Sequence, residues 1–68
     1  MKAEDWIKVT DRLPIKEASV LTYATLFGKA HSIFEGYWDG ENWRASASPD
    51  LLLVGVTHWM YIVKPKED

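Results

Sequence analysis

The sequence predicts a mainly β fold: a small antiparallel sheet of four to five strands in a single domain over residues 1–68. Three observations point to this class. Several short runs are rich in β-branched and aromatic residues, and Gly, Pro and Asp-Gly turn signals separate these runs. Four Trp, three Tyr and two Phe residues also offer an aromatic core. A small α+β fold, with one short helical turn against the sheet, is the alternative.

The chain is short for a folded domain, because 68 residues bury only about 60% of the surface that the unfolded chain exposes. Cysteine is absent, so no disulfide framework can add stability. The core must therefore come largely from the aromatic residues, and we expect most of them to be buried. Trp6 and Trp59 are the rings expected to bring the two ends of the chain together in that core.

Residues 6–9 predict the first strand, as an edge or cover strand of the sheet, since β-branched residues alternate there with other side chains. Pro14 then breaks the run, because proline has no backbone N–H to donate. In the loop before it, the pattern favours Leu13 pointing inward and Arg12 pointing outward. A pairing of Arg12 with a nearby carboxylate is the other interpretation.

Residues 19–27 predict a central strand covered on both faces, because both alternating sets of side chains are partly apolar. Gly28 and Lys29 supply a turn, and residues 31–38 form the antiparallel partner strand. Gly36 inside that second strand marks a bulge or a close approach of another chain's backbone.

Asp39 and Gly40 give the clearest turn signal in the chain, because both residues tolerate the positive φ of a tight β-hairpin. The turn predicts that Trp38 and Trp43 face each other across two antiparallel strands. We expect Gly40 to adopt the positive φ.

The last third of the sequence leaves one element open. Residues 45–50 form a loop of small residues, after which residues 51–53 form either one helical turn capped by Ser48 or a strand. Gly55 ends that element, and residues 56–63 predict the final strand.

Three segments carry a family resemblance: W-I-x-V-x-x-R-L-P at residues 6–14, an aromatic-Asp-Gly turn with a following Trp within residues 36–43, and T-H-W-M at residues 57–60. Together they resemble a family of short proteins found mostly in tailed bacteriophages and prophages and catalogued as a domain of unknown function. Family members commonly continue with a Pro-rich tail. Residues 61–68 keep one proline, which implies a longer last strand.

The resemblance implies an accessory phage protein in the cytoplasm of the host bacterium, where such proteins often counter host defences or redirect host enzymes. The formal net charge of −2, with interleaved signs, leaves no basic patch for nucleic acid. No run approaches the ~20 apolar residues of a membrane span, and the start of the chain lacks the layout of a signal peptide. We expect neither a nucleic acid nor a membrane as partner.

His58 beside Trp59 is the residue most open to a chemical role, since an imidazole on a rigid strand can act as a base, a ligand or a pH sensor. A structural role is favoured, with a carboxylate or main-chain carbonyl of the N-terminal segment as its hydrogen-bond partner. A metal shared by His31 and His58 lacks a known ligand spacing, and neither a catalytic triad nor a phosphate-binding loop is present. We therefore expect no enzyme, no metal and no cofactor.

The expected function is a non-catalytic interaction module that binds a host or phage protein. Tyr37, Trp38 and Trp43, together with Tyr23, are the aromatic residues expected to be exposed for the partner, because Trp and Tyr are enriched at the centres of interfaces. An open sheet edge offers a second route to a partner, by strand addition or as a homodimer.

The alternative function is binding of a nucleotide or other anion, or chemistry on it, in an aromatic pocket that uses His58 and Arg12. The two functions predict different surfaces. A deep pocket on which His58 and Arg12 converge would favour the small ligand, whereas a flat aromatic patch or a paired sheet edge would favour a protein partner.

Overall fold

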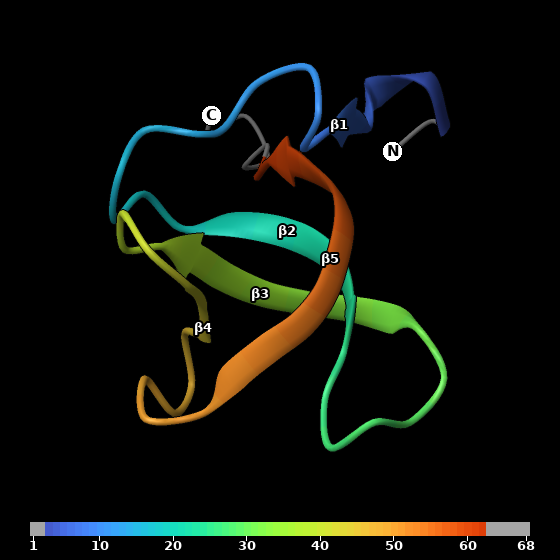
Figure 1. The fold of residues 1–68 in the computed structure, drawn as a ribbon. Coiled ribbons are helices and arrows are strands. Elements are labelled where there is room, and N and C mark those ends of the chain that lie inside the picture. Colours follow the sequence, from blue (N-terminus) through green and yellow to red (C-terminus); the bar gives the residue numbers. More distant parts are fainter. Residues whose placement is uncertain (1–2, 63–68) are drawn as a thin grey trace, which may run out of the picture.

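The computed structural model describes residues 3–62 and is mainly β, with five antiparallel strands in one sheet (Figure 1). This confirms the predicted class and strand number. The elements are the 3-10 turn η1 (Ala3–Asp5) and the strands β1 (Ile7–Lys8), β2 (Val20–Thr25), β3 (Ser32–Trp38), β4 (Trp43–Ala45) and β5 (Leu52–Tyr61).

The sheet closes on itself. Its strand order is β1-β5-β2-β3-β4, and β4 pairs in addition with β5, so that β5, β2, β3 and β4 form a ring with β1 outside it. The start of β5 pairs with β4 and its end pairs with β2. A ring of strands requires strong curvature, and Figure 1 shows β5 as a long, curved strand. Gly55, with a φ of 65°, and a register shift between Tyr23 and Thr25 lie where β5 changes partner.

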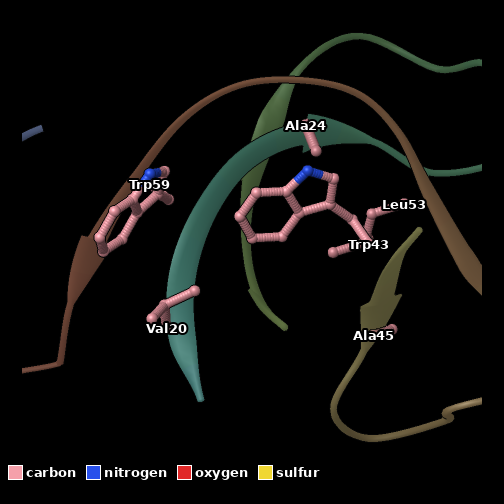
Figure 2. Close-up of a cluster of buried hydrophobic side chains, with 6 residues drawn as sticks. All are labelled: Val20, Ala24, Trp43, Ala45, Leu53 and Trp59. Carbon is pink, nitrogen blue, oxygen red and sulfur yellow. The ribbon is translucent and has the colours of Figure 1, made fainter. Parts of the chain in front are cut away.

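The core fills the inside of this ring. Its buried side chains come from three strands and are Val20, Ala24, Trp43, Ala45, Leu53 and Trp59 (Figure 2). Figure 2 shows the ring of Trp43 extending from β4 toward Ala24 on β2. Thr22 is also fully buried, and its hydroxyl donates a hydrogen bond of 2.9 Å to the carbonyl oxygen of Phe34. That bond removes the cost of burying an unpaired hydroxyl.

The two ends of the described chain meet at β1 and β5, where Ile7 lies opposite Trp59. Trp59 is fully buried, which confirms its predicted place in the core, and its Nε1 donates to the carbonyl oxygen of Arg12 at 2.9 Å. The prediction for Trp6 is wrong. Because side chains alternate along a strand, Ile7 and Val9 pack against the core and Trp6 lies half-buried outside it.

The hairpin between β3 and β4 forms as predicted. Gly40 has a φ of 102°, and the Asp39 N–H donates to the Asn42 carbonyl oxygen at 3.0 Å. Trp38 lies opposite Trp43, and their ring centroids are 5.5 Å apart. This turn is determined by local sequence, which is why the pattern predicts it well.

A backbone does approach Gly36 closely, but it belongs to β4 of the same chain and not to another chain. A Cβ on Gly36 would lie 2.6 Å from the carbonyl oxygen of Arg44 and 2.7 Å from Cδ1 of Leu53. Glycine is required here because the Arg44 carbonyl of β4 and the Leu53 side chain of β5 leave no room for a Cβ.

Two predicted orientations are wrong. Leu13 does not point inward; it is 46% exposed, because the loop after β1 follows the surface and the Arg12 carbonyl, not Leu13, turns toward the core residue Trp59. The strand β2 is not covered on both faces. Its inner residues are buried, whereas Tyr23 on the outer face is 41% exposed, since no second layer covers that side.

The element after the loop of small residues, which the sequence leaves as either a helical turn or a strand, is a strand. Leu52 and Leu53 pair with β4, so the helical alternative is wrong, and β5 continues through Gly55 where the sequence predicts an end. Pairing with β4 and then β2 holds the backbone extended on both sides of the glycine. The predicted extension of this strand to Val63 lies outside the described residues.

Candidate functional site

The aromatic residues predicted to meet a partner have three different environments. Trp43 is 8% exposed and belongs to the core, so its predicted exposure is wrong. Trp38 is half-buried and packs against the core. Tyr37 is half-buried and lines a polar hollow of about 440 Å³ together with Glu17, Ser19, Asp39 and Ser46. The closing of the sheet by β4 removes Trp43 from the surface.

His58 and Arg12 do not converge on one pocket. His58 lines a hollow to which Arg12 does not contribute, whereas the Arg12 carbonyl meets the buried Trp59. The predicted link between His58 and the N-terminal segment is also wrong: His58 Nδ1 hydrogen bonds with the Thr57 hydroxyl oxygen at 2.9 Å, and Trp59 makes the link instead.

The hollow beside His58 crosses the outer face of the sheet. Lys8 lies opposite His58, His58 opposite Tyr23, and Tyr23 opposite Ile33, so these four side chains form one row across β1, β5, β2 and β3. Residues opposite each other in antiparallel strands point to the same face. The row, with Ala3 and Trp6 at its β1 end, lines a hollow of about 420 Å³, which we call the outer-face groove.

Tyr23 is held in place at the middle of the outer-face groove. Its ring meets Trp6 edge-on, with centroids 6.4 Å apart, and meets His31 in a tilted contact at 5.2 Å. Nε2 of His31 donates a hydrogen bond of 2.9 Å to the Gly55 carbonyl oxygen, because a carbonyl only accepts. The bend of β5 at Gly55 therefore fixes His31, and His31 supports Tyr23.

The outer-face groove is shallow and carries little charge. Tyr23 is 41% and Ile33 47% exposed, so the groove is open to solvent along its length. Of the described residues that line it, Lys8 is the one from the set Lys, Arg, Asp and Glu. Glu4 and Asp5 follow Ala3 in the turn η1 but are not among the lining residues.

Part of this groove can be predicted from the sequence. Tyr23 was expected to be exposed, and the alternation of residues 6–9 already places Lys8 on the face opposite Ile7. The place of Ile33 beside Tyr23 could not be predicted, because this place depends on the register between β2 and β3.

An ion pair between Arg44 and Asp39 lies in the hairpin, outside the groove. Backbone N–H of Asn42, the Arg44 side chain and backbone N–H of Glu41 all donate to the Asp39 carboxylate and lower its pKa to about 2. The same hydrogen bond raises the pKa of Arg44. Arg44 Nη1 also donates to the Pro49 carbonyl oxygen at 3.0 Å, which joins the turn to the following loop. These contacts have a structural role.

Within residues 3–62, no group of three or more His, Asp or Glu side chains could hold a metal ion. The outer-face groove offers rings, one ammonium group and hydrogen-bonding atoms of His58 and Tyr23. Such a surface suits binding through side chains.

A family model described as "Protein of unknown function (DUF551)" matches residues 5–67. The chain belongs to the DUF551 family. The match spans the described β-sheet and both end segments of the sequence, and its description names no catalytic activity. Neither the curated proteins nor the solved structures contain a significant match to this DUF551 protein. Its described part holds no helix long and apolar enough to cross a membrane.

Proposed function

We propose that this DUF551 protein is a non-catalytic interaction module that binds a protein through the outer-face groove. The observation that carries the proposal is the groove itself: a row of side chains across four strands, in which Tyr23 is 41% and Ile33 47% exposed. Exposed apolar side chains that gather on one face of a small protein commonly mark interaction sites.

Tyr23 has the properties of an interface anchor. Tyr and Trp are enriched among the residues that dominate binding energy, and a ring already fixed by its neighbours loses little conformational entropy on binding. Contacts with Trp6 and His31 fix Tyr23 in this way. The outer-face groove therefore replaces the hairpin tryptophans as the candidate interface.

The open shape supports a protein partner over a small molecule. Small-ligand sites enclose roughly 70–90% of the ligand, whereas this groove is open along its length. The edge of β1 is a weaker candidate for strand addition or a homodimer, because β1 has only two residues.

The biological setting is part of the proposal. The resemblance of the three sequence segments to short phage and prophage proteins supports a role inside the host bacterium, with a host or phage protein as the partner. Interference with host defence is the role that this setting suggests.

The test is affinity capture from bacteria that produce the tagged protein, with matched variants. Ile33→Ser removes an apolar side chain from the groove, and Val54→Ser removes a comparably exposed one from β5 outside it. The proposal expects at least one protein that the wild type and Val54→Ser capture and that Ile33→Ser and Tyr23→Ser lose. Capture that is unchanged in both groove variants, with melting temperatures also unchanged, would contradict it.

A further inference from the structure

The row of the outer-face groove has a fixed length and a direction. From Lys8 to Ile33 there are three steps between neighbouring strands, and steps of ~4.8 Å give a row of ~14 Å. In an extended peptide, residues i and i+4 are ~13 Å apart, and residues i, i+2 and i+4 point to the same side. An extended segment laid along the row therefore places three alternate side chains into it.

The two ends of the groove differ chemically. Lys8 gives the β1 end a positive charge, and Ile33 gives the β3 end an apolar surface. Glu4 and Asp5 follow Ala3 in η1 but do not line the groove, so Lys8 is the charged side chain that a segment laid along the row would meet. Charge complementarity across an interface selects the partner and its orientation. The partner residue over Lys8 is therefore acidic, and the one over Ile33 is apolar.

The middle of the groove is built from rings. Tyr23 and His58 lie opposite each other, and Trp6 meets the edge of Tyr23. Aromatic side chains pack well against such rings, in edge-on or offset contacts. Nδ1 of His58 bonds with Thr57, which leaves Nε2 as the imidazole atom for a partner.

We infer that the outer-face groove binds an extended protein segment with alternating acidic, aromatic and apolar residues, in which the acidic residue pairs with Lys8 and the apolar residue covers Ile33. The segment crosses the strands and is recognised by its side chains, with no main-chain pairing to the sheet. This inference rests on the proposed function and specifies the chemistry of the partner.

The test is an NMR titration of the 15N-labelled full chain with short capped peptides. One peptide carries Glu-Ser-Tyr-Ser-Leu, a second carries Lys in place of Glu, and a third has one extra Ser between Glu and Tyr. The variant Lys8→Glu reverses the charge at the groove, and Lys29→Glu is the control, because Lys29 lies in the exposed turn between β2 and β3. The dispersion of each spectrum checks that the variant is folded.

We expect the wild type and Lys29→Glu to prefer the Glu peptide over the Lys peptide by about threefold to fivefold, as for an exposed ion pair. The preference should reverse in Lys8→Glu. Amide shifts should change most around Lys8, Tyr23, Ile33 and His58, and the peptide with the extra Ser should bind more weakly.

The inference is overturned by an unchanged preference in Lys8→Glu, by shifts centred elsewhere, or by equal binding of the peptide with the extra Ser. Tighter binding of adenosine monophosphate than of the Glu peptide would also overturn it, in favour of a small anion. If Ile33→Ser loses a captured protein while Lys8→Glu shows no reversal, the proposed function stands and only the peptide chemistry fails. If capture does not depend on Ile33 or Tyr23, the proposed function fails first.

Discussion

The hairpin of β3 and β4 and the outer-face groove both gather aromatic residues, but they use them differently. In the hairpin, Trp43 is 8% exposed and its ring meets Trp38 at 5.5 Å. In the groove, Tyr23 is 41% exposed although it also contacts two rings. The difference comes from the face of the sheet that each strand turns inward. Aromatic content alone therefore does not locate an interface in so small a protein.

The largest effect is expected from the buried rings. Trp43→Ala should cost about 3–5 kcal/mol, because it empties the middle of the core, and a domain of this size has little stability to lose. Trp59→Ala should be as severe. Thermal unfolding followed by circular dichroism measures both, and a Trp43→Ala protein that melts like the wild type would place this ring outside the core.

The next effect is expected at Gly36, where the hairpin and the core meet. Gly36→Ala should destabilise by about 1–3 kcal/mol, because the new Cβ would lie 2.6 Å from the Arg44 carbonyl oxygen. Gly28→Ala is the control: its Cβ would meet nothing within 4 Å, so only the strain of its φ of 70° remains, about 1–2 kcal/mol. Chemical denaturation compares the two. A larger loss in Gly28→Ala would argue against the close contact of β3 with β4.

Substitution in the groove should separate binding from stability. Tyr23→Ser should leave most of the stability intact, because the side chain lies on the outer face, outside the core, and is 41% exposed, but it should weaken partner binding by ~2 kcal/mol or more. Melting temperature and partner capture are measured on the same samples. If the melting temperature and the partner capture fall together, Tyr23 is a structural residue like Trp43, and the two regions do not differ in how they use their aromatic residues.

The smallest effect is expected from the pH dependence of the hairpin. The pKa of Asp39 falls from 3.8 in the unfolded chain to about 2 in the fold. A lowered pKa means that this carboxylate stabilises the fold above about pH 4, and that its contribution is lost as the pH falls toward about 2. Asp39→Asn should therefore melt below the wild type at neutral pH and approach it in acid. A constant gap between the two melting temperatures would assign the effect to something other than titration of Asp39.

The sequence predicted the features that depend on local residues. The Asp39-Gly40 turn, the pairing of Trp38 with Trp43 and the edge position of the first strand all follow from short patterns, and the structure confirms them. The errors concern contacts between distant strands. The burial of Trp43 depends on β4 closing the ring against β5, and the exclusion of Trp6 from the core depends on which face β1 presents to β5.

The candidate site was harder to predict than the fold. The strand patterns place Tyr23 and Lys8 on their respective strands. The alignment of Lys8, His58, Tyr23 and Ile33 depends on the registers in which β1 pairs with β5, β5 with β2, and β2 with β3, and no local sequence pattern specifies these registers. The predicted pocket with Arg12 and His58 requires both side chains on one face of the sheet. The structure brings the two end segments together through Trp59, which points to the opposite face from His58.

The central claim is that the outer-face groove, and not the hairpin, is the binding surface. Titration of the 15N-labelled protein with a captured partner tests it most directly, because each backbone amide reports its own contact. We expect the shift changes to centre on Lys8, Tyr23 and Ile33. Changes that centre on Tyr37 and Trp38, with the groove amides unmoved, would contradict it.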